Sequence, residues 1–200
     1  MNQFDLGYEV VNLFKDLDEV QVVFFRGSLA EGVVDPYSDI DIGIDVSGSD
    51  NAAFTQTIIH RMQAHFDLHF YDWATSLLPD SYVLTFFIKH TPAFWNIDFD
   101  CTATPHVATL HRDDVRATLN KTAHTLKAWV HMAKYYIRQQ DGIEDQIRRR
   151  GEQWLPGQDT SDLSPSQIMK AILDHLHRQA GGEFSGFFEA CYEMYAREIA

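Results

Sequence analysis

The chain has 200 residues, of which 45% are hydrophobic and 13% aromatic, enough apolar material for a folded core and too much for a disordered chain. Its 16 Lys and Arg residues stand against 29 Asp and Glu residues, which gives a formal net charge of −13. Extended nucleic acids are bound mainly through clustered Lys and Arg, so this balance argues against them as partners. It favours a small ligand held by local contacts.

The beginning of the chain has no pattern typical of export. Residues 1–5 carry neither a basic start nor an apolar stretch, so we expect no signal peptide. The apolar run at residues 20–25 contains Gln21 and is far too short to cross a bilayer. We therefore expect a soluble, cytoplasmic protein without membrane contact, and a homodimer is compatible with the sequence.

The first hundred residues alternate between helical and strand-like patterns. Apolar residues at three- and four-residue steps predict an opening helix, and a second helix is predicted after a turn rich in capping residues. Alternating or continuous apolar patterns predict about five strands, the first of them buried and the last two joined as a hairpin. The helices are expected at residues 4–17 and 52–65, and the strands at 20–25, 39–46, 66–73, 82–89 and 94–101. The pattern predicts an α+β fold built on a mixed β-sheet.

After Pro105 the pattern becomes helical. Residues 115–137 keep helical spacing, which predicts one long helix beginning at Asp113 or Asp114. Residues 139–161 are polar and are interpreted as a solvated stretch. Further helices are predicted from Ser164, a capping residue followed by Pro and Gln, to Gly181–Gly182, and over residues 184–200. We expect a C-terminal bundle of about three helices.

The most informative stretch covers residues 24–46, FFRGSLAEGVVDPYSDIDIGIDV. A strand leads to Gly27 and Ser28, ten residues follow, and the next strand presents Asp39 and Asp41. Because successive side chains alternate along a strand, both carboxylates are expected on one face, with the isoleucines toward the core. Paired carboxylates can hold two divalent cations, Gly27 lets a phosphate approach the backbone, and Ser28 adds a hydroxyl.

This Gly-Ser, ten-residue gap and Asp-x-Asp pattern resembles the DNA polymerase beta-type nucleotidyltransferase superfamily. The short chain with a helical tail looks most like small-substrate members, the aminoglycoside and lincosamide nucleotidyltransferases, or the minimal nucleotidyltransferases that pair with helical proteins. The resemblance implies a nucleotidyltransferase core over residues 1–105, a mixed sheet with helices on one side. It also implies a helical domain over residues 106–200 that shapes the acceptor pocket.

The resemblance also implies a third carboxylate on a neighbouring strand. Asp98, which follows the predicted hairpin, is the first candidate, as a metal ligand or as the general base. Asp67 lies on the strand directly after a helix and is an alternative. Asp100 shares the strand face of Asp98 and is a second alternative, as a contact to metal or acceptor.

Cations that contact the triphosphate are expected from the helical part, as in related enzymes. Lys134 is the candidate that we assign to nucleotide binding, and Lys127 lies seven residues earlier on the same side of the predicted helix. Arg26, directly before Gly27, is a weaker candidate for a phosphate contact.

These observations predict an enzyme, a Mg²⁺-dependent nucleotidyltransferase. It would bind ATP with two Mg²⁺ ions, move AMP to a small hydroxylated acceptor and release pyrophosphate. One alternative is an antitoxin-type enzyme that transfers AMP to a hydroxyl of a protein. Another is a nucleotide-binding module without catalytic activity.

If Asp39 and Asp41 hold the metal ions, changing either to Asn removes a charge that the cations need but leaves the apolar face of the strand unaltered. We expect Asp39→Asn and Asp41→Asn to abolish turnover while the thermal unfolding curve stays that of the wild type. Unchanged turnover in both variants would refute the metal site.

Overall fold

The computed structural model describes residues 2–200, which form two compact units. The first unit takes in residues up to 91 and 95–119, and the second takes in residues 92–94 and 120–200. The sequence predicts a division at 105–106, whereas the compact units divide at 119–120. The reason is that Leu110, Val115 and Leu119 of the connecting segment pack against the core of the first unit.

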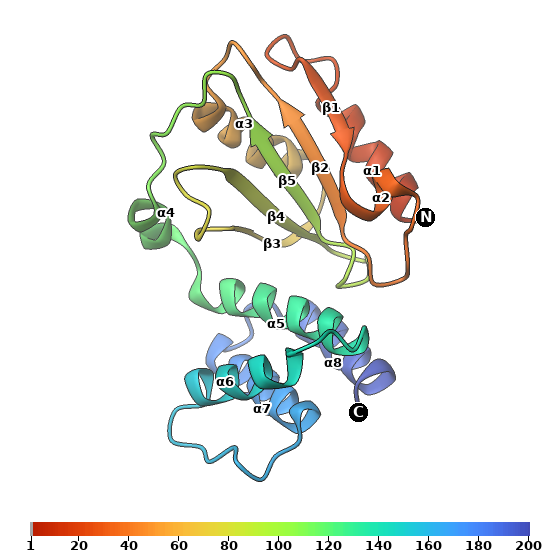
Figure 1. The fold of residues 1–200 in the computed structure, drawn as a ribbon, viewed down its shortest axis with the longest axis vertical. Helices are drawn as coiled ribbons and strands as arrows, with labels where there is room; N and C mark the ends of the chain where they lie inside the picture. The colour runs from red at the N-terminus through yellow and green to blue at the C-terminus, as the bar shows by residue number, and fades with distance from the viewer. Residues whose placement is uncertain (1) are drawn as a thin grey trace. The chain divides into compact units, whose positions relative to one another are not determined.

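The first unit contains a five-stranded mixed sheet of order β1-β2-β5-β4-β3 (Figure 1). The strands β2 and β5 are parallel, and the other neighbours are antiparallel. The strands are β1 (Val22–Phe25), β2 (Ile40–Asp45), β3 (Leu68–Trp73), β4 (Tyr82–Ile88) and β5 (Ile97–Thr102). The five strands and the β4–β5 hairpin are confirmed. The prediction that the first strand is buried is wrong: β1 pairs only with β2 at the sheet edge, so every second side chain is exposed.

The helices of the first unit are α1 (Gln3–Asn12), α2 (Gly27–Glu31), α3 (Asn51–His65) and α4 (Arg112–Thr118). α1 and α3 share one hydrophobic core with the sheet, which confirms helices on one side of a mixed sheet. Ile40, Ile42 and Ile44 of β2 point into this core and are fully buried. Each stabilises the fold by roughly 1.5–3 kcal/mol. The alternation of β2 therefore places its acidic side chains on the opposite face.

The second unit is helical, with α5 (Lys121–Ile137), α6 (Ile143–Trp154), α7 (Pro165–Ala180) and α8 (Ser185–Glu198). The predicted long helix is in fact two, α4 and α5, because Asn120 accepts hydrogen bonds from the first amides of α5 and begins a new helix. The polar stretch predicted at 139–161 contains α6, because Ile143, Ile147 and Gly151 recur at four-residue steps and bury one face.

The helix α7 begins and ends as predicted. Ser164 forms a capping box with Gln167, a proline occupies the first turn, and Gly181 adopts the left-handed conformation that ends the helix. Among residues 2–200, no helix combines the length and the hydropathy needed to cross a bilayer.

The imidazole of His69 on β3 makes the first unit sensitive to acid. Burial, together with the nearby Lys89, lowers the pKa of His69 from 6.5 to about 4. Above pH 6.5 the side chain is neutral in both the folded and unfolded states. As the pH falls from 6.5 toward 4, the unfolded chain takes up a proton that the folded chain excludes, so the free energy of unfolding falls.

We expect His69→Gln to recover roughly 1 kcal/mol of the free energy of unfolding that the wild type loses in acid, after allowance for solvent screening at this partly buried position. Urea unfolding of both proteins, above and within the pH window, measures the difference. His60→Gln, at an exposed position on α3, is the control. An equal acid loss in wild type and His69→Gln would contradict the assignment.

Candidate active site

The parallel pairing of β2 and β5 places acidic side chains beside one another. Asp41 is the register partner of Asp98, and Gly43 is the partner of Asp100. Neighbouring strands lie about 4.8 Å apart, so Asp41 and Asp98 face the same solvent from adjacent strands. Asp39 directly precedes β2, and one of its carboxylate oxygens lies within 4.8 Å of one from Asp98. The structure thus brings the first-choice third carboxylate, Asp98, to the Asp-x-Asp pair.

Hydrogen bonds within and to the loop at residues 35–38, just before β2, fix the position from which Asp39 extends. Asp35 and Ser38 close the loop, with the Ser38 hydroxyl donating to the Asp35 carboxylate at 3.0 Å and accepting from the Asp35 amide at 3.1 Å. From α1, the buried Gln3 amide donates to the carbonyls of Asp35 at 2.7 Å and Ser38 at 3.2 Å. Gln3 therefore positions the acidic loop, a role that the sequence pattern does not reveal.

Gly27 approaches Asp41 so closely that a side chain at this position would have to displace the Asp41 carboxylate. The Arg26 amide donates to the Asp41 carbonyl at 2.8 Å, and Gly27 follows with a φ of +53°. A Cβ at Gly27 would lie 2.4 Å from Asp41 Oδ2. Next to it, Ser28 Oγ is buried without a hydrogen-bond partner among residues 2–200. A backbone cradle and an unused hydroxyl therefore adjoin the carboxylates.

An ion pair borders the same place. Arg26 Nη1 donates to Asp100 Oδ2, and the other oxygen, Oδ1, is buried without a hydrogen-bond partner in the described part of the chain. The pair joins residues 74 positions apart, so the sequence gives no sign of it. A hollow of about 300 Å³ lies here, lined by Arg26, Gly27, Asp41, Val83, Asp98 and Asp100.

Two other predicted residues are not among those that line the hollow. Asp67 precedes β3 at the far edge of the sheet, where its ion pair with Lys89, 2.9 Å long, lowers the pKa of the carboxyl. The strand β4 lies between β3 and β5, so Asp67 is not brought to the hollow. Lys134 lies on α5 in the helical unit, with 7% of its surface exposed, and its contact with a nucleotide stays a prediction.

One carboxylate on this face of the sheet, Asp72, is not among the residues that the sequence predicts for the site. Asp72 on β3 is the partner of Thr85 on β4, and Thr85 is the partner of Asp98. Through these pairings Asp72, which is 1% exposed, lies in the same cross-strand row as Asp98 and Asp41. Only strand pairing places Asp72 there, because the sequence around it has the pattern of an ordinary strand and carries no motif of a site.

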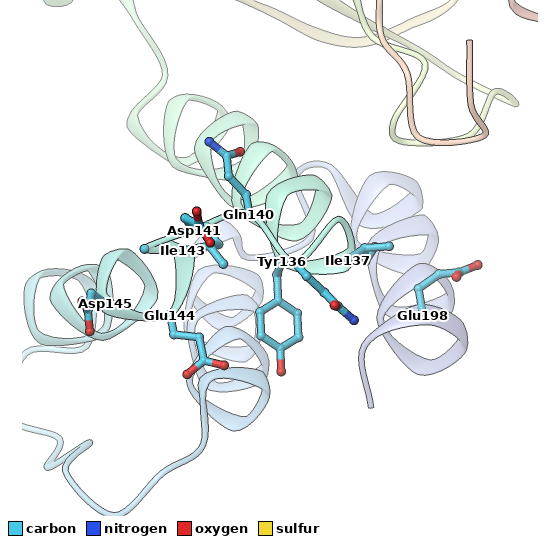
Figure 2. Close-up of a pocket in the computed structure, with 10 residues that line it drawn as sticks. Tyr136, Ile137, Gln140, Asp141, Ile143, Glu144, Asp145 and Glu198 are labelled. Atoms are coloured by element: carbon cyan, nitrogen blue, oxygen red, sulfur yellow. The ribbon is translucent and has the colours of Figure 1, made fainter. Parts of the chain in front are cut away.

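A second hollow, of about 650 Å³, lies in the helical unit (Figure 2). Its charged lining residues are all acidic: Asp141, Glu144, Asp145 and Glu198. In the view of Figure 2, the Tyr136 ring lies between the side chains of Glu144 and Glu198. A lining without a cation disfavours a polyphosphate, so the hollow on the sheet is the better candidate for one.

The donors on the sheet suit a hard divalent cation. Mg²⁺ prefers carboxylate oxygens and retains water, and Asp39, Asp41 and Asp98 offer such oxygens at an accessible face. The Cβ-free cradle at Gly27 leaves Asp41 Oδ2 accessible. Thiolate chemistry is excluded at the neighbouring Cys101, because burial, Asp100 and Asp45 raise the pKa of its thiol to about 12.

Comparison with known proteins agrees with this geometry. The family model described as a nucleotidyltransferase domain matches residues 8–93, which include the Gly27 cradle, Asp39 and Asp41. No curated protein matches the sequence.

The close approach of Gly27 to Asp41 generates a prediction about cation binding. In Gly27→Ala the new Cβ displaces Asp41 Oδ2, so we expect Mn²⁺, used as a probe for Mg²⁺, to bind at least about 10-fold more weakly by calorimetry. Gly32→Ala is the matched control, because Gly32 also has a positive φ, +70°, but open space around it. Equal losses in the two variants would mean that backbone strain, and not the clash, is the cause.

Proposed function

Because the chain carries a nucleotidyltransferase domain of the DNA polymerase beta type, we propose that it transfers AMP from ATP to the hydroxyl of a small acceptor, with Mg²⁺. The observation that carries the proposal is the meeting of Asp41 and Asp98 with Gly27 in one hollow. Carboxylates from two strands beside a side-chain-free backbone suit a cation-bound polyphosphate.

Asp39, Asp41 and Asp98 would hold the divalent cations, which supply charge stabilisation for the phosphoryl group when bound. The Gly27 backbone would leave room for the phosphates, and the unused Ser28 hydroxyl would donate to a phosphate oxygen. Arg26, at the rim of the hollow, would add a charge-assisted hydrogen bond to the same group.

In the transfer itself, the acceptor oxygen attacks the α-phosphorus and forms a new P–O bond. The bond from this phosphorus to the bridging oxygen breaks, and pyrophosphate leaves. Asp98 would either accept the hydroxyl proton itself or complete the cation site, with the proton then passing to water, and both roles fit its place opposite Asp41. The chain's own contribution is therefore mainly positioning and electrostatics.

Incubation of the full chain with ATP labelled at the α-phosphate and Mg²⁺, together with a panel of hydroxylated small molecules, tests the proposal. Pyrophosphate release that depends on a small acceptor supports it. Label on protein hydroxyls would support a protein-modifying enzyme instead, and ATP binding without turnover would support a nucleotide-binding module.

Two of the three candidates for the third carboxylate, Asp98 and Asp67, give opposite expectations. Asp98→Asn removes a charge opposite Asp41, so we expect transfer to fall by at least about 100-fold, whether Asp98 binds metal or accepts the proton. Asp67→Asn is the matched control: it removes an exposed ion pair with Lys89, and activity should stay within about twofold of the wild type. Full activity of Asp98→Asn would remove Asp98 from the site.

A further inference from the structure

The ring of Phe24 lies face-on over Gly43, its register partner across β1 and β2. A Cβ added to Gly43 would lie 2.4 Å from Cζ, 2.6 Å from Cε2 and 2.8 Å from Cε1 of that ring. A point so close to three adjacent ring atoms, and nearly equidistant from them, lies above the ring face and not beyond the ring edge. One face of the ring therefore covers the glycine.

The other face of the ring is open. Phe24 is 44% exposed, although it is a large apolar side chain on the same sheet face as Asp41. β1 is an edge strand of the sheet, and Figure 1 shows it at the border. Within the first unit the sequence thus leaves a flat aromatic surface in water, which costs hydrophobic free energy unless a ligand covers it.

This aromatic surface adjoins the hollow of the candidate active site. Gly43 follows Asp41 by two residues on the same face of β2, roughly 7 Å along the strand. Across the sheet, Gly43 is the partner of Asp100, which lines the hollow. A nucleotide with its phosphates at Gly27 and Asp41 would carry its base within reach of the Phe24 ring, because the distance to be spanned is about that of one sugar.

We propose that Phe24 is a stacking platform for the nucleobase of the triphosphate substrate. The inference rests on the proposed function and adds to it a residue that binds the base. Every base has a π-face, and base–aromatic stacking is tolerant of base identity. The offset-stacked arrangement that aromatic pairs prefer needs an open ring face, which Gly43 creates by letting the ring lie flat.

A purely structural role for Phe24 makes a different prediction. An aromatic ring on an edge strand that covers a glycine of the neighbouring strand also shields the backbone. Phe24→Leu retains apolar cover but loses the π-face, so it separates the two roles. If Phe24 only shields the backbone, Phe24→Leu changes the thermal unfolding temperature and nothing else. If Phe24 is a platform, Phe24→Leu weakens the binding of ligands that contain a base.

The experiment compares ATP with inorganic tripolyphosphate, which has no base, by calorimetry of the full chain with Mg²⁺. In the wild type we expect ATP to bind more tightly than tripolyphosphate. In Phe24→Leu we expect ATP binding to weaken roughly 5- to 100-fold and tripolyphosphate binding to stay unchanged. Phe24→Trp should retain the preference for ATP.

Two further variants control for disturbance of the strand. Gly43→Ala keeps Phe24 but pushes the ring aside, so it should also reduce the preference for ATP. Val22→Ala changes another exposed side chain of the same face of β1, 47% exposed, and should leave both affinities unchanged.

The outcomes separate the platform from the proposed function. An ATP preference that persists in Phe24→Leu, or that is missing in the wild type, overturns the platform even if AMP transfer is demonstrated. A wild type that binds neither ATP nor tripolyphosphate overturns the proposed function together with the platform.

Discussion

The parallel pairing of β2 with β5 is the constraint on which the site depends. One register places Ile42 beside Phe99 in the core and Asp41 beside Asp98 on the opposite face. A slip of one residue would exchange the faces, bury carboxylates and expose isoleucines. The apolar core therefore fixes the spacing of the acidic groups, and the free energy of the core holds two like charges on neighbouring strands against their repulsion.

This repulsion explains why the acidic face needs positive charge. The chain carries a net charge of −13, which repels a polyphosphate at long range. Arg26 supplies one local cation through its pair with Asp100. Bound divalent cations would supply the rest and would invert the sign of the local field.

Two glycines shape the same face by different means. Gly27 has a positive φ and leaves room for the Asp41 carboxylate, whereas Gly43 has ordinary strand geometry and leaves room for the Phe24 ring. At both positions the missing side chain lets another group lie flat against the backbone. The hollow and the aromatic surface beside it follow from these two close approaches.

The sequence by itself determined the five strands, the alternation of β2 and the Gly-Ser and Asp-x-Asp pattern, because these depend on residues close together in the chain. Helix boundaries were predicted less well where a single capping residue divides one apolar pattern into two helices, as Asn120 does between α4 and α5. Only the tertiary structure selected Asp98 over Asp67 as the neighbour of Asp41, and paired Arg26 with Asp100. Strand order and register decide such contacts, and they result from packing between segments far apart in the sequence, which local periodicity does not encode.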